Sequence, residues 1–215
     1  MMPPRPSVQG SAESDHAISR PSWSLTGPAA SIWQAIAADL VAAAASARHP
    51  FHLVTVGTVD EAGTPQVRTV VLRAFDAARR EVRFHTDSRS PKADQIRESG
   101  RAALHWYDPA RRLQIRIAAA ATVHQGDAVA QAAWEASPPR SRACYRAAAA
   151  PGTPVAAVPA ACPPPDPADD RGLAAFAVVC CRFDAVELLS LRAEGHERIR
   201  LALAGPEPTS EILAP

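Results

Sequence analysis

The fold is decided by residues 66–93, which read QVRTVVLRAFDAARREVRFHTDSRSPKA. Aliphatic and β-branched residues at a period of two predict strands over residues 66–74 and 82–86, and the polar residues between them predict a turn. Ser90 followed by Pro91 is typical of a helix start, so a short helix is expected directly after the second strand. The segment therefore predicts a hairpin followed by a helix.

Further strands are expected on both sides of this segment. Residues 51–59 have the same aliphatic composition and are followed by turn residues, so they should pair with the first strand of the hairpin. The remaining expected elements are helices at 32–47, 127–136 and 137–149, and strands at 102–107, 113–122, 173–183, 185–191 and 199–203. Their short spacing predicts a mainly β fold with flanking helices, a Greek-key or meander sheet that closes into a barrel.

The chain is expected to contain one domain. Its 215 residues fit a single domain of ordinary size. Residues 1–28 combine proline, serine and charged side chains with little apolar bulk, which predicts a disordered tail before a domain at 29–215. A proline-rich stretch at about 151–171 predicts an extended surface loop within that domain.

Charge and composition exclude several functions. The formal net charge is +1, from 23 basic and 22 acidic residues, so no nucleic-acid partner and no anionic membrane surface is expected. The alanine-rich helix at 32–47 is too short to span a bilayer, and no signal-peptide pattern is visible, which together favour a cytoplasmic protein. The four cysteines lack the spacing of a zinc or redox motif, so no metal site is expected.

Two cations suggest a site for an anion. Arg68 shares one strand face with Val70 and Leu72, whereas Arg73 falls on the opposite face unless a bulge intervenes. Lys92, the only lysine, lies in the first turn of the expected helix, where the helix dipole disfavours a cation unless an anion binds there. The alternatives are a solvated surface lysine and an edge-strand arginine paired with a carboxylate.

Three segments, taken in order, carry a resemblance to a known family. They are residues 68–73 (RTVVLR), 84–93 (FHTDSRSPKA) and 113–116 (LQIR). Together they resemble the FMN-contacting segments of the pyridoxamine 5′-phosphate oxidase-like flavoproteins, and the likeness extends from Ala30 to the end of the chain. The resemblance implies an FMN-binding split β-barrel that forms a homodimer, with FMN at the subunit interface.

The resemblance also implies roles for individual residues. The cofactor-binding residues that it implies are Arg68, Val70, Val71, His85, Thr86, Lys92, Gln114 and Arg198. The substrate-binding residues that it implies are Arg73, Trp134, Arg142 and His196. Considered alone, Gln114 is an ordinary polar strand residue, and the segment with His196 and Arg198 is equally consistent with a solvated hairpin turn.

The chain departs from the family where the oxidase grips the phosphate of its vitamin substrate. The lysine, tyrosine, arginine and serine of the oxidase correspond to Arg73, Trp134, Pro138 and Arg142. Proline offers no donor and tryptophan cannot accept a hydrogen bond. The tryptophan that stands near the flavin is also missing, with Leu188 or Leu189 in its region. These departures argue against oxidation of pyridoxamine phosphate itself.

Three functions remain open at the level of sequence. The first is an FMN-dependent oxidoreductase that acts on an unknown small-molecule substrate, with no identified catalytic residue, because the flavin ring itself accepts the hydride. The second is a non-catalytic module that binds or senses flavin or haem. The third is a structural dimer that has lost its ligand, which the retention of Arg68, Arg73 and Lys92 argues against.

Overall fold

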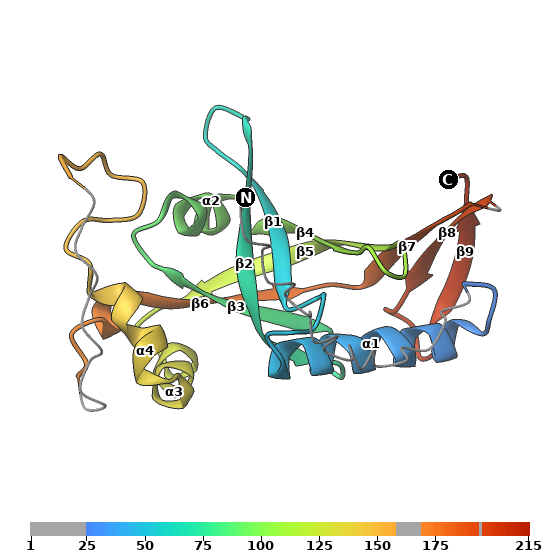
Figure 1. Ribbon diagram of the computed structural model, residues 1–215, viewed down its shortest axis with the longest axis horizontal. Helices are drawn as coiled ribbons and strands as arrows, with labels where there is room; N and C mark the ends of the chain where they lie inside the picture. The colour runs from blue at the N-terminus through green and yellow to red at the C-terminus, as the bar shows by residue number, and fades with distance from the viewer. Residues whose placement is uncertain (1–24, 158–168, 194) are drawn as a thin grey trace, which may run out of the picture.

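In the computed structural model the protein is described over residues 25–157, 169–193 and 195–215, and these residues form one sheet of nine strands (Figure 1). The strands are β1 (Leu53–Val59), β2 (Pro65–Asp76), β3 (Glu81–Asp87), β4 (Arg101–Asp108), β5 (Leu113–His124), β6 (Phe176–Arg182), β7 (Ala185–Arg192), β8 (Gly195–Ala202) and β9 (Thr209–Leu213). The helices are α1 (Ala29–Ala45), α2 (Pro91–Ser99), α3 (Ala128–Ala136) and α4 (Pro139–Arg142). The sheet order is β4-β1-β2-β3-β6-β5-β7-β8-β9, and every pairing is antiparallel.

The first six strands close into the antiparallel barrel that the sequence predicted. Closure occurs because β4 pairs with β5 as well as with β1. The long strand β5 also changes partner along its length: residues 113–116 pair with β7 and residues 120–124 pair with β6. The barrel is therefore continuous with a three-stranded extension, β7-β8-β9, which lies at one end of the long axis of the molecule (Figure 1).

The barrel interior is filled by the alternate aliphatic residues on which the strand predictions rested. Val54, Val56, Leu72, Phe84 and Ile115 are all inaccessible to solvent. Each buried side chain of this size stabilises the fold by about 1.5–3 kcal/mol through removal of apolar area from water. Helix α1 packs on β2 with its apolar stripe and covers part of this core, as its sequence periodicity indicated.

Some expected elements differ from the structure, and one strand was not expected. The helix expected at 137–149 is interrupted: α4 ends at Arg142 and a 3₁₀ turn covers Ala143–Arg146. The strand expected from residue 173 begins at Phe176, after the 3₁₀ turn Leu173–Ala175. Strand β9 was not expected, because its residues lack an alternating apolar pattern. In the structure only Leu213 of this strand is partly covered.

The segments expected to lie outside regular structure are described only in part. Leu25, inside the expected tail 1–28, is buried in the barrel core, and residues 1–24 lie outside the described residues. Residues 151–157 and 169–171 contain no helix or strand, and 158–168, with Cys162, lie outside the described residues. Among the helices of the described chain, none combines the length and apolarity that crossing a membrane requires.

Candidate functional site

Two cations that are 24 positions apart in the sequence come together where the barrel meets α2. Lys92 Nζ donates hydrogen bonds to Thr86 Oγ1 at 3.1 Å and to Ser90 Oγ at 3.3 Å. Arg68 donates from Nη1 to the Thr58 hydroxyl and from Nη2 to Gln95 Oε1 at 3.3 Å. We call these residues the cation cluster: Arg68 and Lys92 with Thr58, Thr86, Ser90 and Gln95.

Strand and helix geometry explain this arrangement. Arg68 lies opposite the buried Val56 in the β1–β2 pairing, so its side chain leaves β2 on the core-facing side, toward α2. Helix α2 begins with Pro91 as predicted and ends at Gly100, whose φ of 63° suits glycine. Ser90 occupies the N-cap position, but its hydroxyl donates to Asp87 O at 2.7 Å and does not cap the helix. No side chain therefore caps the start of α2.

The electrostatics of the cluster favour an anion. Burial lowers the pKa of Lys92, and the neighbouring Arg68 lowers it further, while Asp87 acts in the opposite direction. Burial also lowers the pKa of Arg68. Among the residues that the structure describes, neither cation forms an ion pair with a carboxylate. Two partly buried positive charges thus face each other without a counterion, which is unfavourable unless an anion binds between them.

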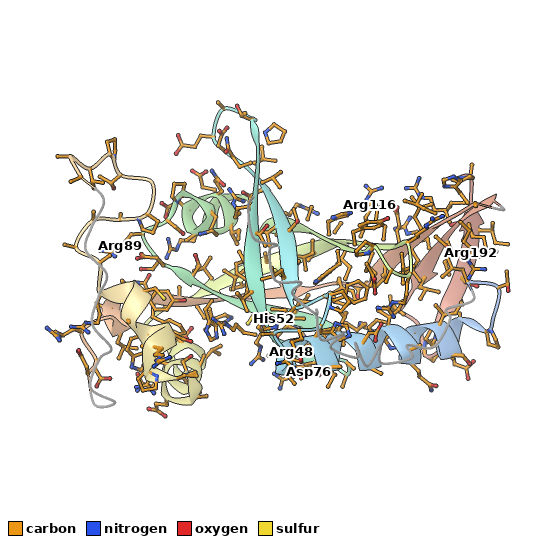
Figure 2. The ribbon with its side chains drawn as sticks, viewed as in Figure 1. Arg48, His52, Asp76, Arg89, Arg116 and Arg192 are labelled. Carbon is orange, nitrogen blue, oxygen red and sulfur yellow. The ribbon has the colours of Figure 1, made fainter. Side chains whose placement is uncertain are left out.

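The nearest carboxylate, Asp87, is held by another arginine. Arg89 contacts both Asp87 oxygens, with Nη2 to Oδ2 at 2.7 Å, and donates to the carbonyls of Ala147 at 2.9 Å and Ala148 at 3.2 Å. This contact lowers the pKa of Asp87 against the effect of its burial. Figure 2 shows Arg89 at the end of the molecule that carries α3 and α4. Arg89 therefore ties the loop after α4 to the turn before α2, and Asp87 acts on Lys92 only through its charge, without an ion pair.

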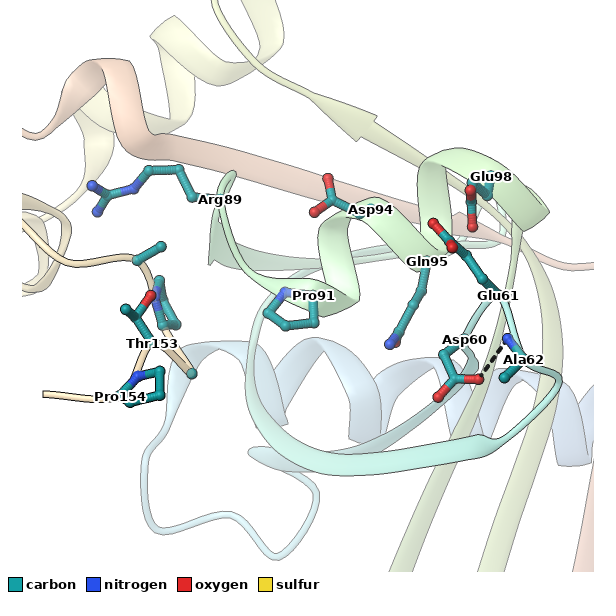
Figure 3. A pocket seen from close by; sticks show the side chains of 13 residues that line it. Asp60, Glu61, Ala62, Arg89, Pro91, Asp94, Gln95, Glu98, Thr153 and Pro154 are labelled. Atoms are coloured by element: carbon teal, nitrogen blue, oxygen red, sulfur yellow. Dashed lines mark hydrogen bonds between the residues drawn. The ribbon is translucent and has the colours of Figure 1, made fainter.

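A cleft of about 610 Å³ lies beside α2 and shares Gln95 with the cation cluster (Figure 3). It is bordered by α2, the β1–β2 turn and residues 150–154. Its acidic residues are Asp60, Glu61, Asp94 and Glu98. Backbone hydrogen bonds, first that from Thr64, lower the pKa of Asp60, so this carboxylate stays ionised. A phosphate would be repelled here, which leaves the cation cluster as the better anion site.

His85 and Arg73 lie on the other face of the sheet from the cation cluster. Both line a second cleft, of about 660 Å³, between β2–β3 and α3. The β2–β3 pairing shifts register between Leu72 and Ala74, so Arg73 is the extra residue of a β-bulge. The bulge does not bring Arg73 to the face of Arg68; it places Arg73 and Ala74 side by side at this cleft.

Trp134 and Arg142 lie behind that cleft and have structural contacts. Trp134 is 1% exposed, packs against Phe176 and donates from Nε1 to Asp170 Oδ1 at 3.0 Å. Arg142 stacks over the Trp134 ring at 5.2 Å and donates to the carbonyls of Ser137 and Glu135. Neither residue is among those that line the cleft, and the substrate-binding role that the resemblance implies for them stays a prediction.

The other predicted residues do not join the cation cluster within one chain. Gln114 and Arg198 each lie opposite Leu189, in β5 and β8, so they share one outer face of the sheet. Arg198 Nη2 pairs with Glu187 Oε2 at 2.7 Å, and His196 is exposed. Strand β8 lies at the far end of the long axis from α3 (Figure 1), the end where Arg116 and Arg192 are seen in Figure 2.

Val70 and Val71, both predicted to contact the cofactor, lie on opposite faces of β2. Val70 packs against the barrel core, whereas Val71 lies opposite the exposed Leu53 on the outer face.

Three residues of the cation cluster were not predicted as site residues. The sequence analysis missed Thr58 and Gln95 and identified Ser90 only as part of a helix start. Thr58 comes beside Arg68 through the β1–β2 pairing and Gln95 through the packing of α2 on β1, and neither residue carries a local signal for this contact.

The barrel and the cluster define a class of protein: a mainly β barrel with two neighbouring cations at the start of a helix. Residues 30–125 match the family described as "Pyridoxamine 5'-phosphate oxidase, FMN-binding domain". Over these residues, 30–125, the chain belongs to the pyridoxamine 5′-phosphate oxidase-like FMN-binding domain family.

Sequence relatives and solved structures agree with this placement. A pyridoxine/pyridoxamine 5′-phosphate oxidase of Anaeromyxobacter dehalogenans is 36% identical over 103 residues, which cover 48% of this chain and 50% of that relative. One from Cereibacter sphaeroides is 40% identical over 65 residues, 29% of this chain and 32% of the relative. The chain thus spans half or less of the curated relatives that it matches.

Two solved structures share the fold over most of the chain. The first is a pyridoxamine 5′-phosphate oxidase-related, FMN-binding protein of Nostoc punctiforme, with a TM-score of 0.69 and 28% identity. It covers 85% of this chain and 97% of its own. PhzG of Burkholderia lata, in complex with tetrahydrophenazine-1-carboxylic acid, has a TM-score of 0.64 and 19% identity, with 88% and 95% covered. The second likeness concerns the fold alone.

Proposed function

We propose that the chain binds FMN and acts as an FMN-dependent oxidoreductase on a small-molecule substrate other than pyridoxamine phosphate. The observation that carries the proposal is the pair of partly buried cations, Arg68 and Lys92, which repel each other and lack a carboxylate partner among the described residues. A flavin phosphate carries close to two negative charges and would neutralise both. The Thr86 hydroxyl, beside Lys92 Nζ, would add a donor to the same oxygens.

The bound flavin would supply the redox chemistry, with its ring as hydride acceptor. The residues of this chain would bind and orient it. The cation cluster would hold the phosphate, and β2 would offer backbone groups at Val70 and Val71. We assign no catalytic residue, because a flavin enzyme does not need a dedicated protein base.

We further propose that the protein works as a homodimer with FMN at the subunit interface. Gln114 and Arg198 share an outer sheet face and lie away from the cation cluster. In a two-fold dimer they could complete the site of the other copy. Large exposed apolar side chains on the outer face of the barrel, among them Leu53, Val67 and Tyr107, support such a contact.

FMN titration of the apo-protein tests the phosphate site. We expect Arg68→Ala and Lys92→Ala each to weaken FMN binding by about 1.5–3 kcal/mol, the scale of a hydrogen bond to a charged group. Arg48→Ala removes an exposed positive charge outside the cluster and is the matched control. Unchanged affinity in both cluster variants would place the phosphate elsewhere, and a colourless protein that does not quench FMN fluorescence would refute FMN binding.

Mixing two defective variants tests the shared site. One carries Arg68→Ala with Lys92→Ala, and the other carries Gln114→Ala with Arg198→Ala. If each site draws on both chains, random pairing of equal amounts restores FMN binding to about a quarter of the sites. If the sites lie within single chains, mixing restores none. Turnover with NAD(P)H would separate an oxidoreductase from a flavin-binding module without catalysis.

A further inference from the structure

The cleft between β2–β3 and α3 has walls of opposite character. Its volume of about 660 Å³ is that of a site for one small organic molecule. The strand wall carries Arg73, Arg83 and His85, with Arg79 at its edge. The helix wall is formed by the apolar side chains of α3, and they are Val129, Ala132, Ala133 and Ala136. Among the residues that the structure describes, no acidic side chain lines the cleft.

The positive charges of the strand wall are not equally available. Arg83 Nε contacts Glu81 Oε1 at 2.6 Å, and Arg79 Nε lies 3.8 Å from Asp76 Oδ2. Arg73 forms no hydrogen bond or ion pair with any residue of the described chain. Burial, aided by Arg73, lowers the pKa of His85 to about 4, so its ring is neutral at physiological pH. The cleft thus offers one uncompensated positive charge.

The helix wall limits the shape of a ligand. Alanine side chains at one-turn spacing leave a smooth apolar surface without donors or acceptors. Pro138 at the end of this wall has no N–H to donate, and the Arg142 guanidinium is engaged by the carbonyls of Ser137 and Glu135. The one free cation would therefore neutralise only half of the charge of a phosphate dianion, whereas it would neutralise the single charge of a carboxylate.

We propose that this cleft binds a small organic monocarboxylate with a flat apolar body. Its carboxylate would lie at Arg73 and its body on the alanine face of α3, with His85 as a neutral hydrogen-bonding neighbour. That the bound molecule is the substrate rests on the flavoprotein function proposed above. The binding itself does not, and it can be measured with or without FMN.

Calorimetric titration with matched probes tests the cleft. The probes are 2-naphthoate, its neutral analogue 2-naphthamide, and 2-naphthyl phosphate as the dianion. We expect 2-naphthoate to bind at least about tenfold more tightly than the other two, as a charge-assisted hydrogen bond allows. Equal affinities of 2-naphthoate and 2-naphthamide, or tighter binding of 2-naphthyl phosphate, would overturn the proposal.

Three variants assign the binding to this cleft. Arg73→Gln should remove the preference for 2-naphthoate over 2-naphthamide, while Arg48→Gln, an exposed arginine that does not line the cleft, should keep it. Ala132→Phe should fill the cleft and weaken both probes about tenfold or more. Ala132 is exposed, so the fold should persist, which circular dichroism checks.

The two proposals fail in different ways. If Arg73→Gln keeps the full preference for 2-naphthoate over 2-naphthamide, the assignment of the binding to this cleft is wrong. This holds whether or not the protein shows the visible absorbance of bound FMN. A protein that binds 2-naphthoate through Arg73 but takes up no FMN would overturn the flavoprotein function and leave the carboxylate site standing.

Discussion

His85 makes the stability of the protein depend on pH in a way that can be calculated. Its ring packs edge-on against Phe176, with ring centroids 4.8 Å apart and an interplanar angle of 73°. Burial, with a smaller contribution from Arg73, lowers its pKa from 6.5 to about 4. The unfolded chain, where the imidazole is solvated, therefore takes up a proton at a higher pH than the folded chain does.

The sign and size of the effect follow from this difference. Because the folded pKa is below the unfolded one, the contribution to stability is complete above about pH 6.5 and is lost as pH falls toward about 4. Integrating the difference in proton uptake from about pH 7.5 to about pH 5 gives a loss of about 2 kcal/mol. The free energy of unfolding continues to decrease at lower pH until the folded protein also binds the proton.

Urea unfolding of the wild type and His85→Gln at the two pH values isolates the contribution of His85 to the pH dependence of stability. Carboxylates with lowered pKa, such as Asp87 and Asp108, destabilise both proteins in acid and cancel in the difference. The wild type should lose about 2 kcal/mol more than the variant between about pH 7.5 and pH 5. His196→Gln gives the effect of losing an exposed imidazole. Parallel pH dependence of the wild type and His85→Gln would show that burial does not hold this ring neutral.

Two further predictions concern the packing around Trp134. Gly172→Ala should destabilise the fold by about 1–3 kcal/mol, because the new Cβ would lie 3.0 Å from Trp134 and 3.1 Å from Tyr145; Gly27→Ala, with open space around it, is the control in urea unfolding. Trp134→Phe should cost about 1–3 kcal/mol in the same assay, because it removes the indole hydrogen bond to Asp170; an unchanged midpoint would mean that this bond does not hold residue 170 to α3.

Local patterns were enough to predict the barrel strands and two of the helices. Alternating residues are buried in β1, β3, β4 and β5 because those strands have one face inside the barrel. The helix expected at 127–136 is α3, and Asp127 caps it by accepting from Ala130 N at 2.9 Å. The start of α2 after Ser90 also agrees, since proline at the first helical position imposes this boundary locally.

The contacts of individual side chains could not be predicted in the same way. The change of partner along β5, which depends on contacts far apart in the sequence, leaves no local pattern. The bond of Trp134 to Asp170 could not be predicted, because it joins residues 36 positions apart. The bulge at Arg73 was recognised as possible, but its direction is set by the register with β3.

The two faces of strand β3 contribute to different proposed sites: one face to the cation cluster and the other to the cleft beside α3. Thr86 faces the cation cluster, and His85, one residue earlier, faces the cleft beside Arg73, because consecutive strand residues point to opposite faces. The bulge at Arg73 adds a charged side chain on the cleft face and leaves Arg68 on the other. Substitutions at the cleft could therefore alter the bound carboxylate while the contacts of Lys92 with Thr86 and Ser90 persist. Such a division explains how this chain can depart from the oxidase at Trp134 and Pro138 and still retain its pair of cations.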